Sequence, residues 1–472
     1  YTLSLHDALP IYGTYLLKAG EKAWFQVVYA GYKKHDQELA LDVNNELLAR
    51  RRFLRRIQGN LVLETPNDVI NTMFSFAKIR GSESIFDTKG GYMQSPGGEA
   101  YQAEYINPFF PYLGYQAGNR SAMDSFGLFM RYMNDEYKPL PSSIIAEGID
   151  CFGVAGDRGD VAMVGYGAAR YALASGNRNE AEKLWPLIEW CLEYCHRQLN
   201  VDGVVKSDSD ELENRFPAGK ANLCTSSLYY DALISAAYLG KALKKEHKQI
   251  KSYQDRAAEL YKNIDVYFAR NVEGYDTYRY YDGNTVLRSW ICIPLTMGIY
   301  EQAKGTVEAL FSDKLWMENG LLTQSGTSTY WDRSTLYAFR GAYSCGARDI
   351  ATEYLDKYSA TRLLGDHVPY AVEAWPEGNQ RHLSTESALY CRIMTEGLFG
   401  IRPIALDAFV MTPQLPESWN MMSLKRVCAF GSIFDIEVKR DKDNKLSVLI
   451  KKDHKIVKRS KIMNGKPIEV RI

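Results

Sequence analysis

The apolar positions of the chain follow two different periods. Between about residues 66 and 402 they recur every three or four residues, as in amphipathic and buried helices. After Pro403 apolar and polar residues alternate, as in β-strands, and residues 12–40 contain short strand-like runs such as AWFQVVYA at 23–30. The pattern predicts a mainly α chain with a small β part on each side of the helical region.

The helical region is divided into segments by short turns rich in glycine and asparagine. Pairs such as GYGAARYALASGN followed by RNEAEKLWPLIEWCLEY are typical of αα-hairpins. A succession of hairpins must bury its apolar faces in a bundle, a solenoid or a ring. The hairpins do not repeat at a fixed period, which favours a ring. The predicted helices cover residues 67–86, 120–133, 160–173, 180–199, 223–244, 250–270, 286–303, 334–341, 348–358 and 385–399.

The pattern divides the chain into five parts. Residues 1–11, YTLSLHDALPI, resemble translated sequencing-adaptor sequence, so we expect them to be non-native and the true start of the chain to be missing. Residues 12–40 are predicted to be the remnant of an N-terminal β domain, and residues 41–65 a linker helix. Residues 66–402 form the predicted helical domain, and residues 403–472 a small β-sandwich.

Charge and composition exclude some classes of partner. Lysine plus arginine and aspartate plus glutamate both number 57, so no bulk basic surface is available for nucleic acid or an anionic membrane. No apolar run approaches the roughly 18 residues of a membrane span. The eight cysteines form no CxxC pair, and the acidic segment 207–216 lacks the spacing of an EF-hand, so we expect neither a metal nor a cofactor. Compartment and oligomeric state stay open.

Several acidic and aromatic residues lie where helices are predicted to begin. Glu373, Trp375 and Glu377 come directly before the last predicted helix, which contains Glu386. Carboxylates beside an aromatic ring suit work on a sugar, although a helix cap with surface glutamates would give the same pattern. Further candidates are Glu104 with Tyr105 and Asn107, the cluster Asp157, Arg158 and Asp160, and the pair Trp331 and Asp332. Capping of a helix and packing in the core are the alternatives for these groups.

The order of these regions resembles the bacterial six-hairpin glycosidases, whose (α/α)6 barrels include α-L-rhamnosidase-like and glucoamylase-like enzymes. Three motifs support the resemblance: QAEYINPFF at 102–110, GDRGD at 156–160, and EAW at 373–375 with EGLFGIRP at 396–403. The α-L-rhamnosidase-like group is the most similar. The resemblance implies an (α/α)6 six-hairpin toroid with a truncated N-terminal β remnant and a small C-terminal β-sandwich. One departure is that the segment before Glu104 is shorter than in related sequences.

The implied activity is hydrolysis of a terminal glycosidic bond in an oligo- or polysaccharide. Inversion needs a protonated carboxyl and an ionised carboxylate roughly 6.5–9.5 Å apart, which different hairpins must supply. We therefore expect Glu104 to be the general acid, with aromatic neighbours that favour its protonated form, and Glu373 to be the general base. Glu377 and Glu386 are the substitutes. The expected substrate-binding residues are Tyr105, Asn107, Asp157, Arg158, Asp160, Trp331, Asp332 and Trp375.

Other functions fit the same helical ring. The short segment before Glu104 makes a catalytically impaired carbohydrate-binding homologue the main rival. A phosphorylase would need basic residues where Glu373 stands. A sugar epimerase would need a histidine pair, for which no partner motif is evident. A polysaccharide lyase would need a Tyr or His base, for which Tyr370 and His382 are the candidates.

Overall fold

The computed structural model describes residues 16–25, 41–88, 90–94, 97–145, 157–210, 216–365, 369–374 and 385–472. The chain divides into two compact units, Tyr1–Arg55 and Arg56–Ile472. In the first unit, residues 16–25 contain a turn and no strand, and helix α1 (Val43–Gly59) begins where a linker helix is predicted. The remainder of the predicted β remnant and the adaptor-like residues lie outside the described residues.

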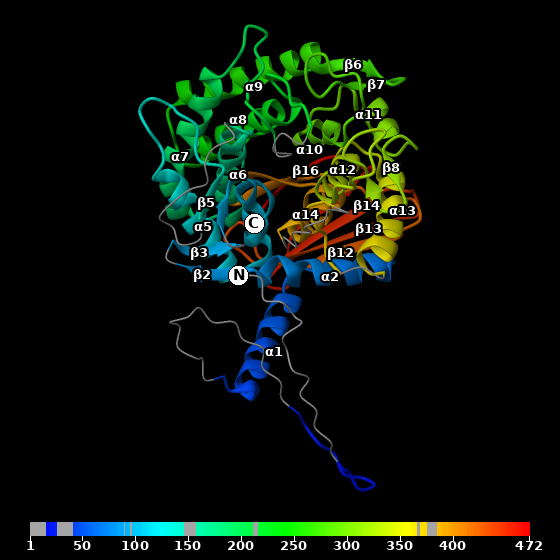
Figure 1. Ribbon diagram of the computed structural model, residues 1–472. Coiled ribbons are helices and arrows are strands. Elements are labelled where there is room, and N and C mark those ends of the chain that lie inside the picture. Colours follow the sequence, from blue (N-terminus) through cyan, green and yellow to red (C-terminus); the bar gives the residue numbers. More distant parts are fainter. Residues whose placement is uncertain are drawn as a thin grey trace, which may run out of the picture. The chain divides into compact units, whose positions relative to one another are not determined.

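The second unit contains a closed ring of inner helices (Figure 1). Each helix contacts the next in chain order, and the last contacts the first. The inner helices are α3 (Ala100–Tyr105), α6 (Asp160–Ser175), α8 (Leu223–Ala242), α10 (Ile293–Met297), α12 (Asp332–Ser344) and α14 (Glu386–Arg392).

An outer helix precedes each inner helix along the chain. The outer helices are α2 (Asp68–Glu83), α5 (Gln116–Met130), α7 (Arg178–Arg197), α9 (His247–Phe268), α11 (Ala303–Leu310) and α13 (Arg348–Tyr358). Among their contacts, α2 packs on α14, α7 on α6, α9 on α8 and α13 on α12. The alternation of outer and inner helices is that of an (α/α)6 toroid, which confirms the predicted fold class.

Burial explains which helices are inner and which are outer. Every residue of α6 from Asp160 to Ala174 is buried, because this helix is covered on all sides. The outer helix α9 buries only Tyr253, Ala257, Leu260, Ile264 and Phe268, a single stripe at helical spacing. Between α6 and α7 the chain turns at Gly176, whose φ of 69° is left-handed, and the side chain of Asn177 caps α7.

The predicted helix at 286–303 is interrupted. Residues Ser289–Cys292 form the 3-10 segment η3, and α10 follows and ends at Gly298, whose φ is 87°. The helix α11 then begins at Ala303, which the sequence pattern placed at the end of the preceding helix. Shorter helical segments are η2 (Asn107–Phe109), α4 (Phe110–Leu113), η4 (Ser359–Leu363) and the π-helical η5 (Ile393–Leu398).

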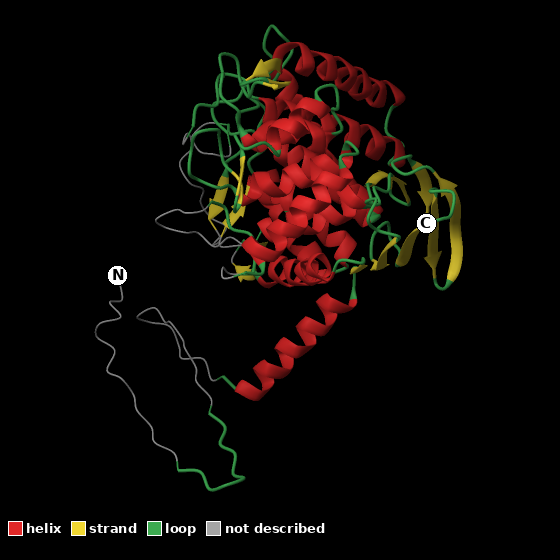
Figure 2. Ribbon diagram, turned by 90° about the vertical axis from the view of Figure 1, so that its right-hand side faces the viewer, coloured by secondary structure: helices red, strands yellow, loops and turns green. Residues whose placement is uncertain are grey.

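Among the described residues, three short hairpins lie in the loops of the ring: β2 (Ile85–Thr88) with β3 (Gly91–Gln94), β6 (Ala269–Val272) with β7 (Tyr275–Tyr278), and β8 (Trp316–Met317) with β9 (Gly320–Leu321). A further two-stranded pair joins β4 (Gly97–Glu99) to β5 (Ser143–Ile145), which are distant in sequence. Figure 2 shows short hairpins on one side of the helices and the C-terminal strands on the opposite side. Within the described residues, no helix has the length and apolar character that crossing a membrane requires.

The C-terminal region forms two antiparallel sheets. One has the order β1-β12-β13-β14-β15 and the other β10-β11-β16. Strand β1 comes from before the ring, within the segment predicted as a linker, and pairs Val62 with Lys425. The main-chain N–H of Phe430 donates a hydrogen bond of 2.7 Å to the carbonyl of Ala174, which connects this region to α6. The strands are β1 (Val62–Glu64), β10 (Ile401–Ala405), β11 (Ala408–Met411), β12 (Met421–Val427), β13 (Phe434–Arg440), β14 (Leu446–Lys452), β15 (Lys455–Ile462) and β16 (Ile468–Arg471).

Candidate active site

Glu104 lies on α3, in the inner ring, and is 1% exposed. Gly167 of α6 allows α3 to lie this close, because a Cβ at that position would overlap the carbonyl of Ala103. The hydroxyl of Tyr337, on α12, donates a hydrogen bond to Glu104 Oε1. Arg392, on α14, donates to the main-chain carbonyl of Glu104. Three further inner helices therefore hold the candidate general acid in place.

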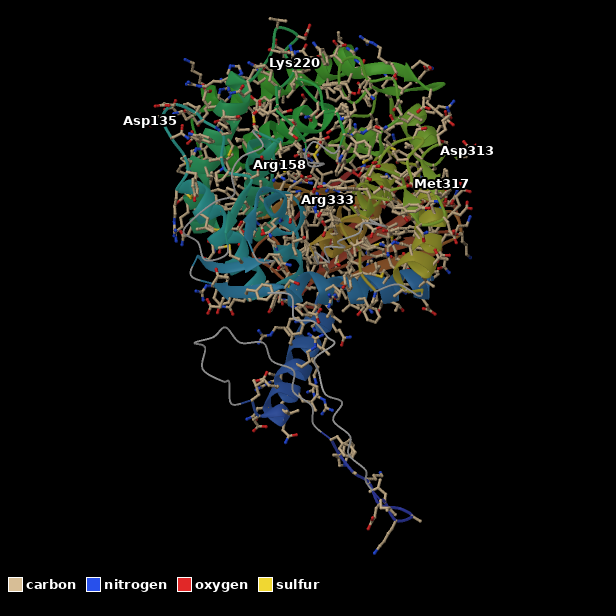
Figure 3. All side chains as sticks on the ribbon, in the orientation of Figure 1. Asp135, Arg158, Lys220, Asp313, Met317 and Arg333 are labelled. Atoms are coloured by element: carbon tan, nitrogen blue, oxygen red, sulfur yellow. The ribbon has the colours of Figure 1, made fainter. Side chains whose placement is uncertain are left out.

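Arg333 connects the neighbourhood of Glu104 to the last hairpin. Its guanidinium lies 4.7 Å from the ring of Tyr101 and 4.8 Å from the ring of Tyr105, both on α3. The same guanidinium pairs with Glu386 of α14, with Nη2 2.8 Å from Oε1. Figure 3 labels Arg333 and Arg158 in the middle of the ring of helices, whereas Asp135 and Asp313 are at its periphery.

Glu386 and Glu373 are close enough for their charges to interact. Burial raises the pKa of Glu386, the negative charge of Glu373 raises it further, and Arg333 opposes both effects. Glu386 is fully buried, whereas Glu373 is 8% exposed. The other two candidates in this segment, Trp375 and Glu377, lie outside the described residues. The structure thus brings Glu104, Glu386 and Glu373 to one region, with Arg333 between α3 and Glu386.

Asp332 binds protein groups from three places in the chain. Its carboxylate pairs with Arg362 at 2.6 Å and accepts hydrogen bonds from the hydroxyl of Tyr358 at 2.9 Å and the main-chain N–H of Val372 at 2.8 Å. The neighbouring Trp331 is buried, with its ring 5.7 Å from the guanidinium of Arg333. Asp332 therefore anchors the residue before Glu373, and its predicted contact with substrate stays a prediction.

The cluster at the start of α6 is engaged internally. Asp157 Oδ1 accepts the main-chain N–H groups of Gly159 and Asp160, and Arg158 pairs with Asp160 at 3.3 Å. Asp160 also accepts from the hydroxyl of Ser142 at 2.7 Å. Burial raises the pKa of Asp157 to about 7, and the charge of Asp160 adds to this effect. These contacts are those of a capping cluster with an internal ion pair, and the predicted sugar binding by these residues remains untested.

The two remaining candidates lie beside Glu104. Tyr105 is buried, stacks on Tyr101 with ring centroids 5.4 Å apart, and packs edge-on against Tyr337. Asn107 is 1% exposed, and among the described residues neither polar atom of its amide has a hydrogen-bond partner.

Sequence reasoning did not assign roles to Arg333, Tyr337, Arg392 or Trp290. Trp290 packs edge-on against Tyr337 at 5.7 Å, and so belongs to the same buried group. Arg333 directly follows Asp332, and Tyr337 comes one helical turn after Arg333, so Arg333 and Tyr337 lie on the same face of α12. That spacing was the available signal for these two residues.

No protein-family model and no curated protein matches the sequence. Among solved structures, the chain is similar to one described as a sialidase, with a TM-score of 0.64, 14% identity, and coverage of 87% of this chain and 41% of that one. It is also similar to a GH78 family rhamnosidase of Bacillus sp. GL1, with a TM-score of 0.60, 11% identity, and coverage of 82% and 41%. A putative kojibiose phosphorylase from the human microbiome gives 0.52, 10%, and coverage of 92% and 66%.

The chain spans 41% of the length of the sialidase and of the rhamnosidase. At these identities the similarity concerns the arrangement of the helices and strands. It agrees with the closed ring of alternating outer and inner helices described above. The fold implied by the resemblance is confirmed at this level: the chain has an (α/α)6 ring of helical hairpins, as these structures do.

Proposed function

We propose that the protein is a glycoside hydrolase that cleaves a terminal glycosidic bond with two carboxylates and inverts the anomeric centre. The observation that supports this most is the grouping of three carboxyl groups, those of Glu104, Glu386 and Glu373. Arg333 lies between α3, which carries Glu104, and α14, which carries Glu386. Buried carboxyl groups from different hairpins are what acid–base chemistry on a glycosidic bond requires. The rhamnosidase among the similar structures makes an α-L-rhamnoside the first substrate to test, followed by an α-glucoside.

In this mechanism Glu104 donates a proton to the leaving oxygen and Glu373 accepts a proton from the attacking water. Burial favours the protonated form of Glu104, whereas the hydrogen bond from Tyr337 favours the ionised form. Glu373 suits the role of base better than Glu386, because Glu386 is fully buried and paired with Arg333. Glu386 would instead hold Arg333 in place beside α3.

The experiment is a screen of aryl glycosides with the full chain, followed by Glu104→Gln and Glu373→Gln on the substrate that is turned over. Each substitution should lower kcat by about 10²–10⁴-fold, the usual contribution of a general acid or base. Glu417→Gln, at an exposed glutamate beyond β11, is the matched control and should leave kcat unchanged. Full activity in either of the first two variants would remove that residue from the mechanism, and the product anomer by NMR tests inversion.

A carbohydrate-binding protein without activity is the second candidate. The observation that favours it is the confinement of Glu104, whose side chain and main chain are both held by buried residues. This function predicts that sugars bind in calorimetry while no aryl glycoside is cleaved. Formation of a sugar 1-phosphate in the presence of phosphate would instead identify a phosphorylase.

A further inference from the structure

A cavity of about 650 Å³ lies between the ring and the C-terminal sheets. On the ring side it is lined by residues of α12 and η5, and on the other side by residues of β10, β11 and the turn before β16. Figure 2 shows the C-terminal strands on the side of the helices opposite short hairpins. The candidate carboxylates Glu104, Glu373 and Glu386 do not line this cavity.

The lining of the cavity is strongly cationic. It includes the five basic residues Arg170, Arg340, Arg348, Arg402 and Lys466 and a single carboxylate, that of Glu396. Two charged residues just outside the lining cancel each other. Asp231 pairs with Arg402 at 3.2 Å and adds one negative charge, and Arg392 pairs with Glu396 and adds one positive charge. An excess of four positive charges around one cavity favours an anionic ligand.

Two buried guanidinium groups in this lining have unused donors. Arg170 is 4% exposed and Arg340 is 1% exposed, and each uses Nη2 to bind Glu396 Oε2, at 2.9 Å and 2.7 Å. Within the described part of the chain, Nη1 of each has no hydrogen-bond partner, and Nε of the half-buried Arg348 has none either. Buried donors are rarely left unsatisfied in folded proteins, because an unpaired donor loses its hydrogen bonds to water and gains none in return.

We propose that this cavity binds a small anion through a phosphate group. Guanidinium forks match the oxygens of a phosphate, and buried donors gain most from a charged acceptor. A neutral sugar fits the lining less well, since Tyr300 is the only aromatic residue that the described lining contains. The volume accepts inorganic phosphate or a small phosphomonoester, and the phosphate group is the chemistry that both share.

The inner wall of the cavity continues into the contacts that hold Glu104. Arg340 and Arg392 both donate to the hydroxyl of Tyr166, at 2.9 Å and 2.7 Å, and Arg392 also donates to the carbonyl of Glu104. The binding site itself does not depend on the proposed hydrolase activity, so it is tested by binding alone.

The test is calorimetric titration of the full chain with inorganic phosphate, with sodium chloride adjusted to keep the ionic strength constant. We expect saturable binding that Arg348→Gln combined with Lys466→Gln weakens by about tenfold, because two charge-assisted contacts are lost. Arg459→Gln combined with Lys461→Gln removes one arginine and one lysine from exposed positions of β15 that do not line the cavity. This matched control should bind phosphate as the wild type does.

Two further variants separate this site from the candidate active site and from general charge effects. Glu373→Gln should leave phosphate binding unchanged, and Arg340→Lys should weaken it while keeping the charge, provided that thermal unfolding shows a folded protein. Glucose 6-phosphate is the phosphomonoester probe. Tighter binding than inorganic phosphate, lost in the Arg348/Lys466 variant, assigns the site to phosphomonoesters, whereas equal or weaker binding assigns it to the free anion.

Three results would overturn the proposal. The first is no saturable binding of either probe. The second is equal phosphate affinity in the wild type and the Arg348/Lys466 variant. The third is loss of binding in Glu373→Gln with retention in the Arg348/Lys466 variant, which would place the anion in the candidate active site.

Discussion

The main-chain N–H of Val372 donates a hydrogen bond to the carboxylate of Asp332 across 2.8 Å. Because Glu373 is the next residue, this contact fixes the approach of the candidate base to the start of α12. The same carboxylate is held by Arg362 at 2.6 Å and by Tyr358 at 2.9 Å, so it is itself firmly placed. Asp332 thus links the start of α12 to the segment that carries Glu373.

Asp332→Ala should therefore lower both stability and activity. Removing one partner of a buried ion pair leaves Arg362 uncompensated and typically costs about 3–5 kcal/mol in the free energy of unfolding. The loss of the Val372 contact should lower kcat more than it raises KM, because it displaces Glu373 and no binding group. Thermal unfolding and steady-state kinetics on the identified glycoside measure the two effects.

Asp332→Asn separates the charge from the hydrogen bond. The amide oxygen still accepts from the N–H of Val372, so kcat should recover relative to Asp332→Ala even though the attraction to Arg362 is weakened. A KM that rises with unchanged kcat in both variants would contradict a positioning role and favour direct contact between Asp332 and substrate.

Tyr337→Phe should change the pH dependence of the reaction. The hydroxyl of Tyr337 donates to Glu104 Oε1, which favours the ionised carboxylate, so its removal favours the protonated acid. The alkaline limb of the kcat/KM profile should then move to higher pH. The phenyl ring keeps its packing against Tyr105 and Trp290, at 5.8 Å and 5.7 Å, so the fold should persist.

The matched control is Tyr343→Phe on the same helix. Its hydroxyl pairs with Thr352 at 2.6 Å and has no contact with Glu104, so its loss should cost about 1 kcal/mol of stability without moving the pH profile. An alkaline limb that stays in place in Tyr337→Phe would argue that Glu104 is not the acid whose ionisation limits the rate.

The ring of hairpins could be predicted because its signals are local. Helical periodicity and turns such as Gly176-Asn177 appear in consecutive residues, and the structure places helices α6 and α7 on either side of that turn. The signal for the break in the predicted helix at 286–303 was also local, because Pro294 lies at the start of α10 and Gly298 at its end. The apolar residues continue across this break, however, and their helical spacing favoured a single uninterrupted helix.

The partners of the candidate residues could not be predicted because they are distant in sequence. Tyr337 is 233 residues from Glu104, and Arg392 is 288 residues from it. Strand β1 likewise pairs with β12 across the whole ring, and three residues with strand character give no indication of such a partner. Periodicity predicts which face of a helix is buried, and only the closed ring determines what lies opposite it.

Gly167→Ala should disturb Glu104 without touching it. A Cβ at this position would come closer than 3.0 Å to the carbonyl of Ala103, which real Cβ atoms essentially never do. Since the obstacle is main chain, α3 must shift, and we expect a loss of about 1–3 kcal/mol in stability together with lower kcat. Gly127→Ala on α5, where nothing lies within 4 Å, is the control and should be neutral or slightly stabilising. Wild-type kcat in Gly167→Ala would show that activity does not depend on the position of α3.

Asp157 should make the stability of the protein depend on pH. Burial first, and the charge of Asp160 second, raise the pKa of Asp157 to about 7, above the value of about 3.9 in an unfolded chain. Between these values the folded state keeps a proton that the unfolded state releases. The contribution of this group to stability is therefore fully present below about pH 4 and is lost as the pH rises through about 7.

Asp157→Asn should remove this dependence, because an amide stays neutral and its oxygen still accepts the N–H groups of Gly159 and Asp160. Relative to wild type, the variant should gain roughly 1–3 kcal/mol of stability between about pH 5 and about pH 8. Thermal unfolding at both pH values measures the difference, with Asp202→Asn at an exposed turn as the control. If wild type and Asp157→Asn lose stability in parallel over this range, the Asp157 carboxyl is already ionised in the folded protein, and the group at the start of α6 is an ordinary charged cap.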